Sequence, residues 1–465
     1  MADGNDLLAL GAAPGSIWGD EAETIVYAQA SGNGQSLIFR FSLNPANPPQ
    51  TLSNRIVNCF HVIDEDDIES TFPSRSEMRK AIWSAVAKAW AGCVGDEKNL
   101  KPGVIVDINT NDAGDVTWKA TQDPLFEQYL DLLHDVQPTD LAPEGNIPSV
   151  VDISEVVILD KISGRSGAKS ARLRTGEADS SPFVFKGIDF QTFLQVHDEE
   201  GEYSRAMLET WKRTSKLVAG MTSHPNVQPP PKYLVAVSGP GGKMIYIGHL
   251  STFSTKGYLS DVIEAENEGE TQIDRQKKAK WCHQMSLALA HTHYVLKTYH
   301  MDIRPQNFLV DEQENLVLVD WEQKQVTAAT LAPEADGTRD VKENGSKLVY
   351  TEYAGPERSN IPDDGVQNGW NVFPEWHPSC PLATELAEVF SLGRTMWMLL
   401  SQEDIDFDEI EHPDDVEVVW SDNGDPASWA KMVDRCMEKD PNKRPSLTEI
   451  VKFWEEEVVK LDTSS

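Results

Sequence analysis

The most informative segment of the chain reads His300-Met301-Asp302-Ile303-Arg304-Pro305-Gln306-Asn307. An apolar stretch follows it, and after a polar turn a second apolar stretch, Leu316–Val319, leads directly into Asp320. Phosphoryl transfer from a triphosphate needs one aspartate to receive a hydroxyl proton, and an asparagine and a second aspartate to hold magnesium. We therefore predict that Asp302 is catalytic and that Asn307 and Asp320 bind the metal.

This segment resembles the catalytic loop of the eukaryotic protein kinases, and Asp320-Trp321-Glu322 resembles their Asp-Phe-Gly motif. The resemblance implies ATP and Mg²⁺ as cofactors, with Asp302 facing the substrate hydroxyl. It also implies that Arg304 keeps a positive charge near the γ-phosphate, where serine/threonine kinases usually carry lysine. Glu322 replaces the glycine of the family motif, and we expect it to stiffen the backbone at that point.

Two further strings resemble motifs of the large kinase lobe. Tyr353–Glu357 resembles the Ala-Pro-Glu motif, and its glutamate is predicted to pair with Arg444 in the string Cys436–Ser446. Glu388–Gly393 resembles the start of the central helix, where the family carries an aspartate that caps the catalytic-loop backbone. Glu388 is longer by one methylene, so the sequence leaves open whether the cap is made.

From Val150 onward the pattern predicts strands, one helix, more strands and then mostly helices. This order is typical of an α+β, bilobal kinase-like fold over residues 150–465, with the small lobe at about 150–250 and the large lobe at about 251–465. The predicted elements of the small lobe are strands at Val156–Leu159, Phe183–Phe185, Tyr233–Val237 and Met244–Ile247, and a helix at Glu202–Gly220.

Four residues of the small lobe are candidates for nucleotide binding. Lys186 ends a strand that resembles the Val-Ala-Ile-Lys strand of the family, which implies that it anchors the α- and β-phosphates. Glu209 is the candidate carboxylate partner of Lys186, although the alignment can slip by one helical turn. Gly164 and Gly167 could cover the phosphates with their backbone amides. A plain hairpin turn explains these two glycines equally well.

Residues 1–145 form a separate α+β region for which the sequence indicates no function. Its predicted elements are a β-hairpin of Thr24–Gln29 and Ser36–Ser42, a helix at Met78–Val94 and a short helix at Leu125–His134. A Pro- and Asp-containing stretch, Gln137–Pro148, is the predicted linker to the kinase-like part.

Composition excludes several classes of partner. The formal net charge of −34 opposes binding to nucleic acid or an anionic membrane through a basic surface. The five cysteines occur singly, which predicts a reduced intracellular protein, cytoplasmic or nuclear, without a zinc site. The start of the chain does not resemble a secretory signal. Leu382–Leu400 is interrupted by charges and is predicted to be a buried helix rather than a membrane span.

Three functions remain open from the sequence. The first is a protein kinase, with serine or threonine as the acceptor, and the second is a pseudokinase that serves as a binding module. The third is a small-molecule phosphotransferase, a group that also tends to carry Asp-Trp-Glu. Met301 replaces the arginine that usually pairs with a phosphorylated activation segment, so we expect no activation by that phosphate. The acidic stretch Glu403–Glu417, if exposed, favours substrates with Arg or Lys near the acceptor. The oligomeric state is not indicated.

Overall fold

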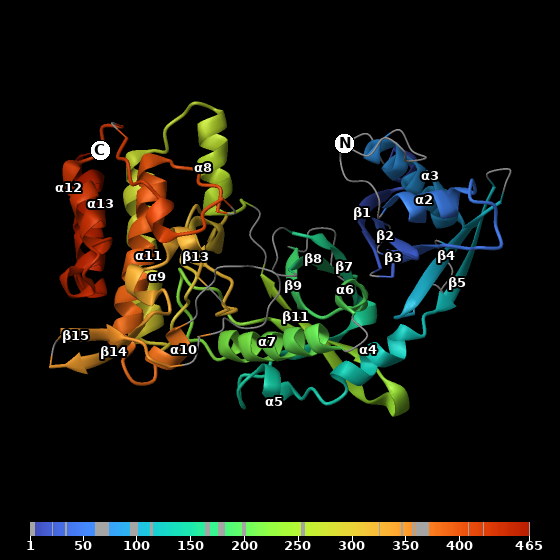
Figure 1. Cartoon of the computed structure of the whole chain (residues 1–465), viewed down its shortest axis with the longest axis horizontal. Coiled ribbons are helices and arrows are strands. Elements are labelled where there is room, and N and C mark those ends of the chain that lie inside the picture. Colours follow the sequence, from blue (N-terminus) through green and yellow to red (C-terminus); the bar gives the residue numbers. More distant parts are fainter. Residues whose placement is uncertain are drawn as a thin grey trace. The chain divides into compact units, whose positions relative to one another are not determined.

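The chain is described here by a computed structural model, in which it divides into two compact units (Figure 1). Unit 1 comprises Met1–Ala219 and Pro231–Phe253, and unit 2 comprises Gly220–Pro230 and Ser254–Ser465. The structure describes residues 5–20, 22–32, 35–60, 74–93, 101–111, 115–162, 168–174, 182–197, 201–252, 256–324, 326–345, 347–355, 358, 372–407, 409–421 and 423–464.

A five-stranded sheet begins unit 1, with its strands in sequence order from β1 to β5. All neighbours are antiparallel except β3 and β4, which run parallel. Helices α2 and α3 pack against this sheet around a buried core that includes Phe39, Ile82 and Trp90 (Figure 1). The predicted hairpin is confirmed, since β2 and β3 pair along their lengths. The bounds are α1 Asn5–Ala9, β1 Ala12–Gly19, β2 Ile25–Gly32, β3 Gln35–Ser42, α2 Leu52–Phe60, α3 Arg75–Cys93, β4 Val104–Thr110 and β5 Val116–Gln122.

A six-stranded sheet forms the rest of unit 1, in the order β6-β10-β11-β9-β8-β7. The strands and the long helix predicted for the small lobe are confirmed within it. Only β6 and β10 pair in parallel; the other neighbours are antiparallel. The bounds are α4 Leu125–Leu133, α5 Pro138–Leu141, β6 Ser149–Asp152, β7 Val156–Lys161, β8 Lys169–Leu173, β9 Phe183–Gly187, α6 Phe190–Val196, α7 Glu202–Ala219, β10 Tyr233–Ser238 and β11 Met244–Thr252.

The two sheets of unit 1 share one apolar core. Tyr129 on α4 is buried between them, and its hydroxyl donates a hydrogen bond to the carbonyl of Ile188 at 2.9 Å. Phe126 meets Phe190 edge to face with ring centroids 5.1 Å apart. The domain boundary predicted between residues 145 and 150 lies between α5 and β6, and the division of the chain there stays a prediction.

Unit 2 is mostly helical. Helix α9 contacts both α11 and α13, and every residue of α11 from Ala383 to Ser401 is buried, as predicted for Leu382–Leu400. Among the residues that the structure describes, no helix is long and apolar enough to cross a membrane. The bounds are α8 Leu259–Glu268, α9 Arg275–Tyr294, β12 Phe308–Val310, β13 Leu316–Leu318, β14 Arg339–Asn344, β15 Lys347–Glu352, α10 Phe373–Trp376, α11 Pro381–Ser401, α12 Ala427–Cys436 and α13 Leu447–Ser464. The sheet-rich unit 1 and the helical unit 2 confirm the predicted α+β class.

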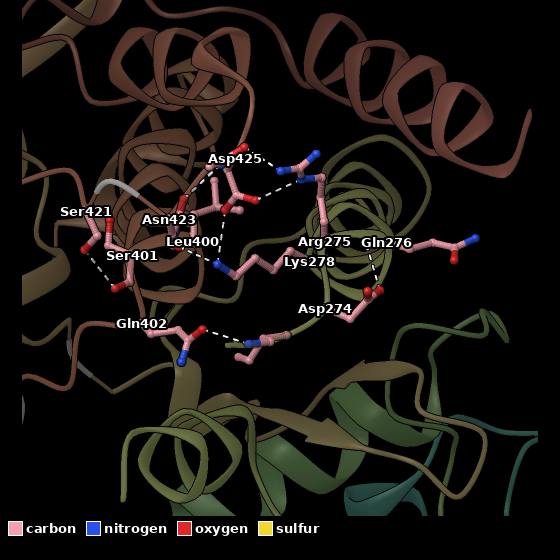
Figure 2. A network of polar contacts seen from close by, with 12 residues as sticks. Asp274, Arg275, Gln276, Lys278, Leu400, Ser401, Gln402, Ser421, Asn423 and Asp425 are labelled. Atoms are coloured by element: carbon pink, nitrogen blue, oxygen red, sulfur yellow. Dashed lines mark hydrogen bonds and ion pairs between the residues drawn. The ribbon is translucent and has the colours of Figure 1, made fainter. Parts of the chain in front are cut away.

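A polar network joins the beginning of α9 to the end of α11 (Figure 2). The ammonium of Lys278, a buried residue on α9, donates to the carbonyl of Leu400 at 2.8 Å and to Asp425 at 3.1 Å. The Arg275 guanidinium reaches the other oxygen of Asp425 at 3.5 Å. Gln402 caps the same region by accepting the backbone N–H of Ile273 at 2.8 Å. These contacts fix two helices that carry parts of the candidate site.

Candidate active site

Glu388 on α11 holds the backbone at the start of the catalytic loop. Its Oε1 accepts the N–H of His300 at 2.8 Å and also the N–H of Met301, and its Oε2 lies 2.5 Å from Nε2 of His293 on α9. The Glu388 side chain is fully buried. A carboxylate enclosed in this way is stable only when its oxygens are hydrogen-bonded, and here both are. The longer side chain therefore does cap the loop.

The backbone is strained on either side of this site. Met301, next to Asp302, has a φ of +83°, and Asp320 has a φ of +68°. Residues with a side chain seldom adopt this left-handed region, and they keep it only where the surroundings hold them. Met301 is completely buried, and Glu388 binds its amide. The loop is thus fixed in a conformation that the local sequence alone does not favour.

The hairpin of β12 and β13 brings Asp320 to the catalytic loop. His300 shares a hydrogen bond of 2.7 Å between its Nε2 and the carbonyl of Val319, and the N–H of Val319 donates to the carbonyl of Asn307 at 2.9 Å. Trp321 packs edge to face against the His300 ring, with centroids 4.7 Å apart. Asp320 therefore follows Val319, which is hydrogen-bonded to His300 and Asn307 at the two ends of the loop.

Asp302 contacts two other predicted site residues, Asn307 and Arg304. Asn307 donates through Nδ2 to the Asp302 carbonyl at 2.7 Å and to Oδ2 at 2.8 Å, and Nε of Arg304 lies 3.1 Å from the same Oδ2. The other carboxylate oxygen, Oδ1, is buried and has no hydrogen-bond partner within the described part of the chain. Buried polar atoms are rarely left unpaired, so Oδ1 is the atom that a bound hydroxyl would satisfy.

The donor atoms here suit magnesium. Because the Asn307 amide nitrogen is engaged with Asp302, its amide oxygen remains as the acceptor of that side chain. Asn307 and Asp320 thus offer an amide and a carboxylate oxygen, the hard ligands that Mg²⁺ prefers. Mg²⁺ in nucleotide sites is usually held by one or two such protein ligands together with water and phosphate. The residues present fit that pattern.

Arg444 pairs with Glu334, and the predicted pair with Glu357 stays a prediction. The guanidinium meets both carboxylate oxygens of Glu334, at 2.5 and 2.8 Å, and also donates to the carbonyls of Leu386 and Glu438. Glu357 lies outside the described residues. Glu334 ends the string Ala332-Pro333-Glu334, which is the literal family motif. This string in the printed sequence is the signal that could have identified the partner of Arg444.

The segment between Asp320 and Glu334 is short and largely enclosed. Ala328–Leu331 is buried, and the carbonyl of Thr330 accepts a hydrogen bond of 2.7 Å from the Ser391 hydroxyl on α11. Thr330 itself is fully buried. The hairpin of β14 and β15 follows Glu334 instead of preceding it. The segment is therefore anchored to α11 by direct contacts.

Lys186 lies on β9 opposite His249 on β11. His249 is buried, and its Nδ1 lies 3.1 Å from the hydroxyl of Ser215 on α7. Burial, together with the positive charge of Lys186, lowers the pKa of His249 to about 3, so the imidazole is neutral near pH 7. Lys186 is thus close to the inner face of α7, but the side chains on that face are Ser204, Leu208, Trp211, Thr214, Ser215 and Val218.

Glu209 lies on the outer side of α7. Its side chain is 70% exposed and pairs with Lys212 of the same helix at 2.9 Å. A pair between Glu209 and Lys186 would require α7 to turn about its axis, and that pair stays a prediction. Gly164 and Gly167 lie outside the described residues, so their predicted role also stays a prediction.

A family model matches the second half of the chain. Residues 247–454, from β11 to α13, match the protein kinase domain. The match contains the catalytic loop, Asp320, Glu334, Glu388 and Arg444. These are the residues whose contacts are described above. The sheet from β6 to β10 and the five-stranded sheet precede the match. Residues 247–454 of the chain therefore carry a protein kinase-like domain.

Proposed function

We propose that this protein is an ATP- and Mg²⁺-dependent protein kinase that phosphorylates serine or threonine hydroxyls. The observation that carries the proposal is the environment of Asp302. Its Oδ2 is held by Asn307 and Arg304, and its buried Oδ1 has no partner within the described residues. A carboxylate oriented on one side and open on the other is arranged to accept a hydrogen bond from a substrate hydroxyl.

In this mechanism the substrate hydroxyl oxygen forms a bond to the γ-phosphorus while the bond from that phosphorus to the β–γ bridging oxygen breaks. Asp302 Oδ1 receives the hydroxyl proton, and ADP leaves. Arg304, 3.1 Å from Asp302, supplies positive charge to the transferring group. Because Glu388 fixes the strained backbone before Asp302, the carboxylate needs little reorganisation during the reaction.

The remaining site residues bind the nucleotide and metal. Asn307 and Asp320 would hold Mg²⁺ through their oxygens, and the metal would neutralise charge on the phosphates. Lys186 would bind the α- and β-phosphates. The neutral state of His249 leaves Lys186 as the cation of this pair. Gly164 and Gly167 would cover the phosphates from above.

The test is transfer of label from γ-labelled ATP to a serine/threonine peptide library, with the Asp302→Asn variant as control. Nucleotide binding is measured in parallel by the thermal shift that ATP and Mg²⁺ produce. We expect Asp302→Asn to bind nucleotide as the parent does and to lose at least about a hundredfold in transfer rate, the usual contribution of a positioned base. An unchanged transfer rate in that variant would refute the role of Asp302.

The substrate that we propose is a basic protein segment. Arg304 Cζ lies 5.5 Å from the centre of the Phe407 ring, so the acidic stretch Glu403–Glu417 runs beside the catalytic loop. Among the described residues of the stretch, seven acidic side chains are exposed: Asp404, Asp406, Glu409, Glu411, Asp414, Asp415 and Glu417. Such a surface attracts Arg and Lys near the acceptor. Peptides in which the Arg and Lys near the acceptor are replaced by glutamine should be poorer substrates. Equal transfer rates for the basic peptides and the glutamine peptides would contradict this assignment.

A pseudokinase is the second candidate, favoured by the small lobe. The inner face of α7 carries no carboxylate next to Lys186, since its only acidic residues, Glu202 and Glu209, are exposed. Glu322 also stands where the family has glycine. Phosphate transfer, measured together with the thermal shift, separates the candidates. Nucleotide binding with Asp302-dependent transfer supports the kinase, while the absence of any transfer over all peptides would favour the binding module.

A further inference from the structure

Unit 1 contains a cavity of about 170 Å³ between its two sheets. Its apolar walls come from both sheets and from α4, and they include Leu37, Phe126, Val156 and Ile247. A cavity of about 150 Å³ with walls of this kind accommodates a benzene ring. The space therefore suits a single ring or a short chain, and such a ligand would contact both sheets at once.

Among the described residues, the charged groups that line the cavity leave an excess of positive charge. Asp189 is the lining carboxylate, and Lys169 neutralises it, with its ammonium 2.7 and 2.8 Å from the two oxygens. Lys101 and Arg174 also line the cavity, and both are exposed, so they lie at its opening. Within the described residues neither has an ion-pair partner. This excess is notable in a chain with 75 acidic and 41 basic residues.

Arg174 is only partly hydrated. Burial of part of its guanidinium lowers its pKa, and within the described part of the chain no carboxylate opposes that effect. A cation that loses water without gaining a counter-charge is less stable than a paired one, and an anionic ligand would remove that cost.

Gln29 provides a polar point inside the cavity. The residue is 3% exposed and its Nε2 donates to the hydroxyl of Ser36 at 2.8 Å. Its Oε1 is buried and has no hydrogen-bond partner among the residues that the structure describes. Both Gln29 and Ser36 line the cavity. A hydroxyl or N–H group of a ligand would satisfy this oxygen.

We propose that this cavity binds a small amphiphilic anion, a carboxylate or phosphate monoester on a single ring or short chain. The anionic group would lie at Arg174 and Lys101, the apolar body against Leu37 and Phe126, and a donor group at Gln29. This site lies within unit 1 and is independent of the phosphoryl-transfer proposal.

The test uses the full chain and three probes of similar size. These are 4-hydroxybenzoate, phenyl phosphate and the neutral 4-hydroxybenzamide, titrated by calorimetry with ATP and Mg²⁺ present in excess. At roughly 0.4 kcal/mol per heavy atom, a ten-atom probe should bind with a Kd of about 1 mM. We expect one or both anions to bind and the amide to bind at least about tenfold more weakly, because it lacks the charge-assisted contact.

Matched variants locate the binding. Arg174→Gln and Lys101→Gln should each weaken the anions by about tenfold without affecting the amide. Arg172→Gln removes the same charge from an exposed position near the end of β8 that does not line the cavity, and it should bind like the parent. The preferred anion identifies a carboxylate or a phosphate ligand. Equal Kd values in the parent and in both lining variants, or no saturable binding by any anion, would overturn the proposal.

Discussion

Arg444 and Glu334 form a two-point ion pair that is closed off from solvent, with the arginine side chain 0% and the glutamate side chain 5% exposed. The pair joins the segment that follows the catalytic hairpin to the loop between α12 and α13. Because Arg444 also donates to two backbone carbonyls, most of its hydrogen-bonding capacity is used within unit 2. The pair therefore fixes where the segment after Asp320 ends.

Glu334→Gln should be strongly destabilising. Removing one charge from a buried pair leaves the other uncompensated, and we expect unit 2 to lose about 3–5 kcal/mol of unfolding free energy. The measurement is calorimetric unfolding of the full chain, compared between the variant and the parent. Glu357→Gln is the control and should change little. A larger effect for Glu357→Gln than for Glu334→Gln would mean that Arg444 has another partner.

Glu388→Gln should slow transfer while leaving the chain folded. A neutral amide has a single acceptor oxygen and would still reach the His300 and Met301 amides, but more weakly than a carboxylate. We expect kcat to fall about tenfold or more with the KM for ATP nearly unchanged, because the strained backbone before Asp302 is held less firmly. Glu385→Gln, which alters an acidic residue one turn away on α11, is the matched control. A change confined to KM would argue against this role.

Transfer should not depend on phosphorylation of the segment between Asp320 and Glu334. Thr330 is buried and bonded to α11, and Met301 offers no positive charge to a phosphate. Activity should therefore be the same before and after phosphatase treatment of protein purified from eukaryotic cells. A Thr327→Ala variant, which removes the other hydroxyl of this segment, should also retain its rate. A large loss in either experiment would show that an added phosphate does activate the protein.

The stability of unit 1 should fall in acid because of His249. In the unfolded chain this imidazole titrates near 6.5, whereas the folded pKa is about 3. Between these values the unfolded state binds the proton and the folded state does not, so stability is present above pH 6.5 and is lost as the pH falls toward 3. The loss is about 1.4 kcal/mol per pH unit.

His249→Gln tests this dependence. The variant cannot take up the proton, so the difference in melting temperature between it and the parent should shrink from pH 7 to pH 4. His134→Gln, which changes an exposed histidine of unit 1, should follow the parent at every pH. A constant difference between His249→Gln and the parent would contradict this prediction, because it would mean that the pKa of His249 is the same in the folded and unfolded chain.

The catalytic loop could be predicted because its chemistry depends on residues that are close in the sequence. Asp302, Arg304 and Asn307 stand within one loop, and a short hairpin adds Asp320. The partner of Arg444 was harder, because two strings, ending at Glu334 and Glu357, compete for one motif. We assigned the motif to the string that ends at Glu357, whereas the folded chain brings Arg444 to Glu334.

The orientation of α7 could be predicted from the sequence, whereas the cavity in unit 1 and the backbone of Met301 needed three-dimensional information. The orientation of α7 follows from its apolar stripe, Leu208, Trp211 and Val218, and this spacing already places Glu209 outside the stripe. The cavity in unit 1 could not be predicted, since its lining comes from strands that are far apart in the chain. The conformation of Met301 also depends on a carboxylate from α11 that lies distant in sequence.

Through the contacts of Lys278, the position of the catalytic loop depends on residues that do not contact the substrate. Helix α9 runs from Lys278 to the chain that enters the loop, and α11 runs back from Leu400 to the carboxylate of Glu388. The two helices are thus joined by polar contacts at one end, and the catalytic loop lies at their other ends. A substitution at Lys278, Asp425 or Gln402 would therefore change the position of the Asp302 carboxylate without changing any residue that contacts the substrate.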